Sequence, residues 1–126
     1  MNQQGHLAIS AASATSNQIR AYLYRNNAAT DLSTGVPSNA YAINKYDQVV
    51  GLTSTDINRA SLFEGGRIID LNTVNDSTGG LTLRSAIAVN DTGQILCSGT
   101  YPGAGATVLL TPNALVTNPV TITKEP

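Results

Sequence analysis

The sequence is poor in the side chains that most enzymes and metal sites use. Its 126 residues contain one His, one Cys and no Trp. A single Cys cannot form an intramolecular disulfide, and one His with one Cys cannot supply a Cys/His zinc cluster. Groups for acid–base catalysis near neutral pH are equally scarce. We therefore expect no cofactor, no metal site and no catalytic residues, and the unpaired Cys leaves the cellular compartment open.

Charge of either sign is also scarce. The sequence has seven Lys and Arg residues and eight Asp and Glu residues, which gives a net charge of -1. Such a balance exerts no broad pull on nucleic acid or on an anionic membrane. The sequence has no apolar run of about 18 residues, and its first residues lack the basic and apolar regions of a signal peptide. We expect neither nucleic-acid binding nor membrane insertion.

Strong helix formers are few, since Glu occurs only at Glu64 and Glu125 and Lys only at Lys45 and Lys124. Thr, Asn, Ser and Gly are abundant instead, and this composition favours β-strands and turns. Short runs of β character recur between turn signals. They predict about eleven strands, at residues 6–10, 20–24, 29–32, 40–44, 48–53, 60–63, 67–71, 85–90, 94–99, 106–110 and 119–123.

The runs follow a repeating pattern. Asn2, Asn44 and Asn90 each open a short turn before an apolar run, at spacings of 42 and 46 residues. Residues 21–24 likewise match residues 60–63 and, more loosely, residues 106–109. Each unit has the length of one propeller blade of four antiparallel strands. We predict a single repeat domain, 1–126, with units at about 1–38, 39–82 and 83–126.

The repeat predicts an all-β, propeller-like fold of about three four-stranded antiparallel blades. The first blade is expected to be incomplete, because Met1 stands where the other units have Ile43 and Val89, the ends of their innermost strands. A β-sandwich is the alternative, which explains the strands but not the repeat. Propellers close with about four to eight blades, and an open blade exposes apolar surface. We therefore expect self-association, most simply a homodimer closing a ring of about six blades; the other interpretation is a fragment of a longer array.

The units read "AYAINKYDQVVG" with "ASLFEGGRIIDLN", and "SAIAVNDTGQILCSG" with "ATVLLTP". This pattern resembles the HAF-type extracellular repeat, whose units read roughly A-x-A-I-N-x-x-G-Q-V-V-G, then A-F-L-W and D-L-G. The resemblance covers essentially the whole chain. Asp47 departs from it by replacing the turn glycine, and Tyr24 and Phe63 stand where the family often has Trp. The resemblance implies a propeller-like repeat protein that is often secreted, and it implies no catalytic residues.

A ligand-binding face is expected at the long loops. Successive antiparallel strands alternate in direction, so short turns gather on one face of such a domain and long loops on the other. Binding residues concentrate on loops that a rigid scaffold holds in place. The candidate ligand-binding residues on the long-loop face are Asp56, Asn58, Arg59, Asn75, Asp76, Arg84 and Tyr101.

Other notable residues are assigned structural roles. The repeated asparagines are expected to close Asx-turns, and Asp31 and Asp70 to bind backbone amides at equivalent corners. Cys97 replaces the Gly51 of the preceding unit, which predicts a small, buried and inert position. Residues 75–80 contain the oxygen groups and glycines of a calcium loop but lack its further carboxylates.

The sequence thus favours a non-enzymatic binding module that presents its long-loop face to a glycan or a protein. One alternative is a propeller enzyme, a glycan lyase or hydrolase, in which Asp56 or Asp76 would need a raised pKa. Another is a structural repeat fragment with no site of its own.

Overall fold

The computed structural model describes residues 1–14, 16–73, 80–112 and 120–124, with side chains as far as Thr111. Eleven strands follow one another, and none of the described segments is a helix that could span a membrane. The all-β prediction is confirmed. The strands are β1 (Leu7–Ala12), β2 (Ile19–Arg25), β3 (Ala28–Asp31), β4 (Ser38–Ile43), β5 (Val49–Ser54), β6 (Asn58–Glu64), β7 (Arg67–Asp70), β8 (Thr82–Val89), β9 (Ile95–Tyr101), β10 (Ala104–Pro112) and β11 (Val120–Lys124).

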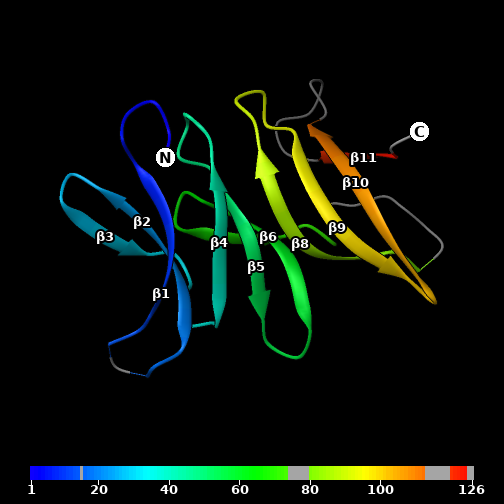
Figure 1. Cartoon of the computed structure of the whole chain (residues 1–126), viewed down its shortest axis with the longest axis horizontal. Coiled ribbons are helices and arrows are strands. Elements are labelled where there is room, and N and C mark those ends of the chain that lie inside the picture. The colour runs from blue at the N-terminus through cyan, green and yellow to red at the C-terminus, as the bar shows by residue number, and fades with distance from the viewer. Residues whose placement is uncertain (15, 74–79, 113–119, 125–126) are drawn as a thin grey trace.

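The strands form three antiparallel sheets in which each strand pairs with its neighbour in sequence (Figure 1). The first sheet has three strands, β1-β2-β3, and the other two have four strands each, β4-β5-β6-β7 and β8-β9-β10-β11. The unit boundaries drawn from the sequence fall where β4 and β8 begin. In the described part of the chain, no strand pairs with β1 in the way that β4 pairs with β5 and β8 with β9.

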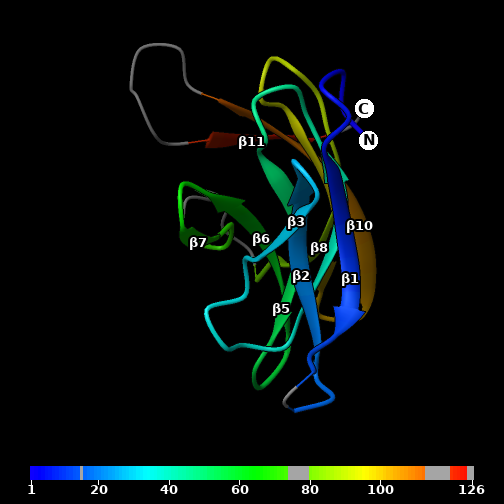
Figure 2. The same cartoon turned by 90° about the vertical axis from the view of Figure 1, so that its left-hand side faces the viewer.

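The sheets contact one another in the same way twice. Strand β4 lies against β1 and β2, and β8 lies against β5 and β6, so the middle sheet is covered on both faces. The view in Figure 2 shows the first sheet in front of the second. Stacked sheets of this kind occur in sandwiches and between propeller blades.

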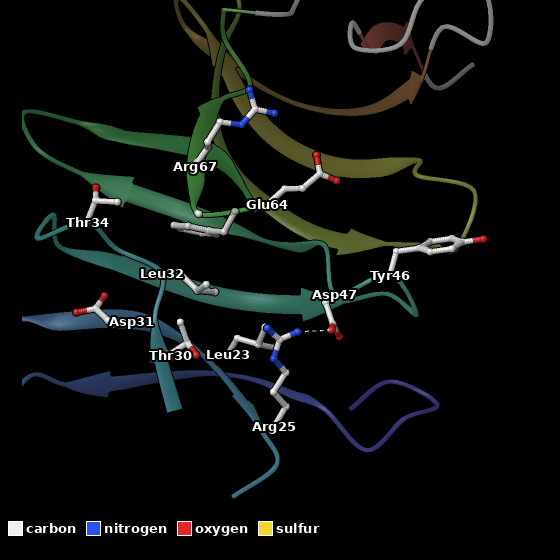
Figure 3. A pocket seen from close by; sticks show the side chains of 13 residues that line it. Leu23, Arg25, Thr30, Asp31, Leu32, Thr34, Tyr46, Asp47, Glu64 and Arg67 are labelled. Atoms are coloured by element: carbon white, nitrogen blue, oxygen red, sulfur yellow. Dashed lines mark hydrogen bonds and ion pairs between the residues drawn. The ribbon is translucent and has the colours of Figure 1, made fainter. Parts of the chain in front are cut away.

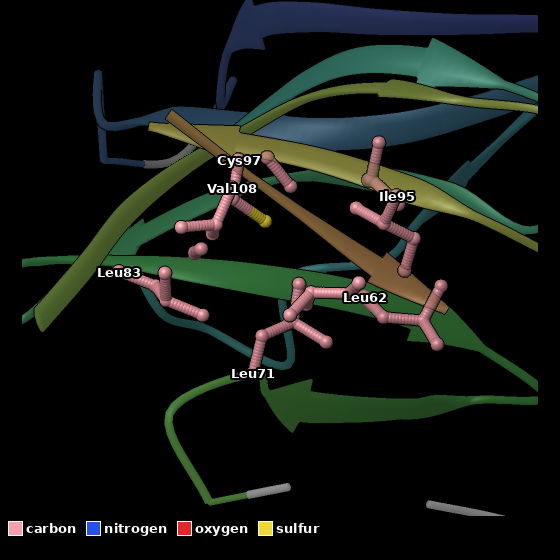
Figure 4. Close-up of a cluster of buried hydrophobic side chains, with 10 residues drawn as sticks. Leu62, Leu71, Leu83, Ile95, Cys97 and Val108 are labelled. Carbon is pink, nitrogen blue, oxygen red and sulfur yellow. The ribbon is translucent and has the colours of Figure 1, made fainter. Parts of the chain in front are cut away.

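Two apolar clusters fill the spaces between the sheets. Neighbouring residues of β5 point to opposite faces, as strand geometry requires: Val49 joins the first cluster and Val50 the second. The first cluster is Ala21, Leu23, Ala40, Val49 and Phe63. The second (Figure 4) is Val50, Ala60, Leu62, Leu71, Leu83, Ala86, Ile95, Cys97, Val108 and Leu110.

Strands β4 and β8, which are the first strands of their sheets, share a bulge. The register shifts between Ala40 and Ala42 in β4, and between Ala86 and Ala88 in β8. The extra residues, Tyr41 and Ile87, are 50% and 44% exposed. A bulge at the same place in two strands re-aims the equivalent side chain in each, and the alanines that precede the two extra residues, Ala40 and Ala86, are buried.

One detail of the predicted repeat is wrong by one residue. Tyr24 and Phe63 pair with Leu7 and Val49 at the starts of β1 and β5, but the residue that pairs with Ile95 at the start of β9 is Leu110. Residues 107–110, not 106–109, therefore correspond to residues 21–24 and 60–63. The hairpin from Ile95 to Leu110 is one residue longer than the hairpin from Val49 to Phe63, which the alanine match did not reveal.

Close packing between β4 and β5 yields a test at Gly51. A Cβ at this position would lie 1.9 Å from the carbonyl oxygen of Asn39, whereas a Cβ at Gly105 meets nothing closer than 4.0 Å. We expect Gly51→Ala to lower the free energy of unfolding by about 1–3 kcal/mol or more. Gly105→Ala should leave it unchanged or raise it by about 0.4–1 kcal/mol. Urea denaturation of both variants checks this, and equal effects would contradict the strand contact.

Candidate functional site

Three turns in a row lie along one edge of the molecule, at the top of Figure 1. Each is built on its asparagine, whose Oδ1 accepts the backbone N–H groups of the residues two and four positions later, at 2.9–3.1 Å. The backbone carbonyl of the same asparagine accepts the N–H of Gly5, Asp47 or Gly93. The Asx role predicted for Asn2, Asn44 and Asn90 is confirmed.

The asparagines also connect the turns to one another, which the sequence analysis did not predict. The Nδ2 of Asn2 donates to the backbone carbonyl of Asn44, and the Nδ2 of Asn44 donates to that of Asn90, both at 3.0 Å. The backbone N–H of Lys45 donates to Asp91 Oδ1 at 2.8 Å. Each turn is therefore hydrogen-bonded to the next one.

Asp47 joins the first two sheets at this edge. Its φ of 60° is left-handed, like the 79° and 84° of Gly5 and Gly93 at the equivalent turn positions, and this conformation costs a non-glycine residue about 1–2 kcal/mol. The carboxylate accepts hydrogen bonds from Asn2 Nδ2 at 2.8 Å, His6 Nδ1 at 2.8 Å and Arg25 at 3.1 Å. Although its conformation strains the turn, Asp47 therefore holds the first sheet against the second through these three contacts. We call Asp47 with Asn2, His6 and Arg25 the Asp47 clamp.

The surroundings of Asp47 shift its pKa. Burial raises the pKa of this carboxyl, but the hydrogen bonds from His6 and Asn2, the charge of His6 and the hydrogen bond from Arg25 lower it further than burial raises it. The net pKa lies below the ordinary value of 3.8. The clamp therefore depends on an ionised carboxylate.

A cleft of about 390 Å³ opens beside this clamp, between the β2–β3 hairpin and the β6–β7 hairpin (Figure 3). Apolar side chains of Leu23, Leu32 and Phe63 form its floor. Its walls combine hydroxyl, charged and backbone groups from both hairpins and from the 44–48 turn. These are Arg25, Thr30, Asp31, Thr34, Tyr46, Asp47, Glu64, Gly65, Gly66 and Arg67.

Most charged groups of the cleft already have partners. Arg25 pairs with Asp47, Asp31 pairs with Arg20 at 3.3 Å, and Glu64 accepts a hydrogen bond from Gln48. Among the described residues, none forms an ion pair or side-chain hydrogen bond with the Arg67 guanidinium, which lies at the edge of the group of lining residues in Figure 3. With respect to the described residues, the cleft thus offers one uncommitted cation.

Five of the seven predicted ligand-binding residues are described, and none of them lines the cleft. Arg59 Nη2 lies 3.5 Å from Asp56 Oδ2, and Arg59 Nη1 lies 3.5 Å from Asp70 Oδ2. Asn58 begins β6 beside them, at the loop edge in the lower part of Figure 1. The structure therefore brings Asp56, Asn58 and Arg59 together.

The other predicted ligand-binding residues lie apart from this group. Arg84 Nε donates to Thr100 Oγ1 at 3.3 Å, and Tyr101 ends β9. Asn75 and Asp76 lie outside the described residues, as does most of the loop at 75–80. In the described chain, no group of three or more His, Cys, Asp or Glu side chains converges so that it could hold a metal.

The structural roles predicted for three other residues are confirmed. Asp31 Oδ1 accepts the backbone N–H of Ser33 at 2.7 Å, and Asp70 Oδ1 accepts that of Asn72 at 2.9 Å. Cys97 is fully buried, and burial raises the pKa of its thiol to about 12. Such a thiol is inert at neutral pH.

The requirement for a raised pKa at Asp56 is not met. Hydrogen bonds from the backbone of Ile57 and from the side chain of Thr55 lower the pKa of Asp56 to about 2. This carboxyl is ionised at neutral pH and has no proton to donate as a general acid. The enzyme alternative therefore gains no support from Asp56 and stays a prediction.

The sequence analysis did not predict the cleft because it expected binding residues on the long loops and not on the short hairpin turns. The cleft lies between the short hairpins of two sheets, where residues distant in sequence meet. One signal was present, since Asp47 replaces a glycine in a left-handed turn position, and a strained residue can mark a site.

The clamp predicts a pH dependence of stability. A folded-state pKa of Asp47 below its unfolded value stabilises the fold fully above the unfolded value, and this contribution is lost as the pH falls through the folded value. We expect the free energy of unfolding to fall less steeply below about pH 4 in Asp47→Asn than in the wild type. Asn also tolerates the left-handed conformation. Urea denaturation from neutral to acidic pH checks this, and parallel curves would contradict it.

The comparisons with known proteins add no identification. No protein-family model, no curated protein and no solved structure matches the chain. The resemblance to the HAF-type repeat stays a prediction, and the geometry of the chain alone must support any proposal about function.

Proposed function

We propose that the chain is a non-enzymatic binding module whose ligand is a short glycan carrying a carboxylate. The ligand occupies the cleft between the first and second sheets, at the short-turn edge of the molecule. The single observation that carries this proposal is the uncommitted Arg67 guanidinium at the edge of a cleft with an apolar floor.

The same proposal treats the three sheets as successive blades of a propeller-like assembly. Its support is the repeated contact of β4 with β1 and β2 and of β8 with β5 and β6. A two-layer sandwich buries one face of each sheet, whereas this middle sheet has a buried cluster on each face. The first cleft between blades then forms the ligand site.

The chemistry of the cleft fits a sugar ring. Leu23, Leu32 and Phe63 offer apolar surface to the C–H face of a ring, while Thr30 and Thr34 offer hydroxyl groups to its polar edge. A guanidinium binds a carboxylate through two parallel hydrogen bonds, which suits Arg67 to a uronic acid. The volume lies at the lower end of the range for small-molecule sites, so we expect one or two sugar units.

The carboxylates of the cleft favour binding over catalysis. Burial raises the pKa of Asp31, but hydrogen bonds from Ser33 and the nearby Arg20 bring it below its ordinary value. Asp47 is shifted in the same direction. A glycoside hydrolase needs one carboxyl that stays protonated to act as the general acid, and neither of these two aspartates meets that need.

Binding can be tested by NMR titration of the ¹⁵N-labelled chain with glucuronate and, separately, with glucose. We expect glucuronate to shift amide signals at Thr30–Thr34, Tyr46–Asp47 and Gly65–Arg67, and glucose to shift them less. Arg67→Gln should weaken glucuronate binding about tenfold or more, because it removes a charged hydrogen-bond donor.

Arg84→Gln is the matched control, since Arg84 belongs to the long-loop candidates and lies outside the cleft. It should leave glucuronate affinity unchanged. Loss of binding in Arg84→Gln but not in Arg67→Gln would place the site on the long-loop face instead. Absence of any shift with both sugars would overturn the glycan proposal.

A further inference from the structure

The first sheet leaves open a face that its counterparts bury. The paired residues Val49 and Phe63 of the middle sheet, at 0% and 1% exposure, pack against the first sheet. The equivalent pair of the first sheet is Leu7 and Tyr24. Tyr24 is 36% exposed and Leu7 only partly buried.

Among the described residues, the third sheet likewise leaves its opposite face less buried than its counterpart in the middle sheet. In the middle sheet, the paired residues Val50 and Leu62 are buried against β8 and the sheet that contains it. The equivalent pair of the third sheet is Leu96 and Leu109, and both side chains are only partly buried. Within the chain, each contact between sheets joins a face of one sheet to the opposite face of the next, and this happens twice. The two open faces are equivalent to the two faces that meet in such a contact.

The row of linked asparagines is open at the same two ends. Asn2 and Asn44 each donate from Nδ2 to the next turn, but within the described chain the Nδ2 of Asn90 donates only to Gln94 Oε1. The carbonyls of Asn44 and Asn90 each accept from the preceding turn, whereas that of Asn2 accepts only from Gly5 among the described residues. Within the described residues, Asn90 Nδ2 thus lacks an acceptor in a next turn, and the Asn2 carbonyl lacks a donor from a preceding turn.

We propose that a second copy of this chain covers both faces by head-to-tail contact. The Leu96 and Leu109 face of one copy packs against the Leu7 and Tyr24 face of the other, and Asn90 of one copy donates to the carbonyl of Asn2 in the other. Two such contacts close a ring of two chains with six sheets, three from each chain, which lies within the usual blade number of propellers. This inference does not depend on any ligand of the cleft.

The contact between copies differs from the internal contacts in one respect. Among the described strands, the first sheet has no equivalent of β4 or β8. The junction therefore buries less apolar surface than the contacts that those strands help to form. A smaller apolar contact binds more weakly. We therefore expect a reversible monomer–dimer equilibrium rather than a permanent dimer.

Sedimentation equilibrium over a range of protein concentrations tests the proposal. We expect the mass to rise from one chain to two and no further. Tyr24→Lys and Leu109→Glu should each reduce dimer formation at least tenfold, because each places a charge in an apolar contact. Ile57→Glu is the control, since Ile57 has the same 36% exposure as Tyr24 and lies in the connection between β5 and β6. Thermal melts confirm that each variant folds, and Leu96→Glu replaces Leu109→Glu if that variant does not.

Mixing the two charged variants tests the head-to-tail geometry. In an equimolar mixture of Tyr24→Lys and Leu109→Glu chains, one junction keeps both native faces and the other pairs Lys with Glu. We expect the mixture to regain dimers that neither variant forms alone. Three results would overturn the proposal: a monomer at every concentration, open-ended polymers, or a dimer whose formation neither substitution reduces.

Discussion

The amide side chain of Asn44 makes two kinds of contact on which the alignment of the sheets depends. Its Oδ1 closes the turn between β4 and β5, and its Nδ2 donates to the turn between β8 and β9. An isolated hairpin gains little from a tight turn, because it still exposes both faces. A turn that also binds its neighbour sets the position of one sheet against the next, so that Val49 and Val50 each reach their own apolar cluster.

The two contacts between sheets share this plan but differ in chemistry. The contact between the second and third sheets holds the larger apolar cluster, which includes Leu71 and Leu83. The contact between the first and second sheets holds fewer buried apolar side chains and adds the Asp47 clamp. The polar cleft opens beside that clamp. The difference explains why this cleft, with its charged walls, lies at the contact between the first and second sheets.

Much of the fold could be predicted from sequence because its determinants are local. Strand positions follow from β-prone runs between turn residues, and the turn role of Asn90 follows from its spacing before an apolar run. The burial of Cys97 follows from the glycine it replaces. These features depend on a few neighbouring residues, which a single sequence displays.

The candidate site could not be predicted in the same way. Arg25, Asp47 and Arg67 belong to different strands and turns, and only the stacking of two sheets brings them to one cleft. The hydrogen bonds between successive turns join residues 42 and 46 positions apart. Sequence spacing showed that these turns are alike but not that they touch. The register of β10 was missed because one added residue in a hairpin leaves the apolar pattern almost unchanged.

The role of the asparagines is tested most directly by comparing Asn44→Asp with Asn90→Asp. Aspartate keeps the oxygen that closes the turn, and both variants lose the bond to Gln48 or Gln94, but only the buried Asn44 also loses a bond to the next turn. Urea denaturation at neutral pH and at protein concentrations where the chain is monomeric measures both free energies of unfolding. We predict a loss of about 1–3 kcal/mol for Asn44→Asp and about 0.5 kcal/mol or less for Asn90→Asp. Equal losses would contradict the account.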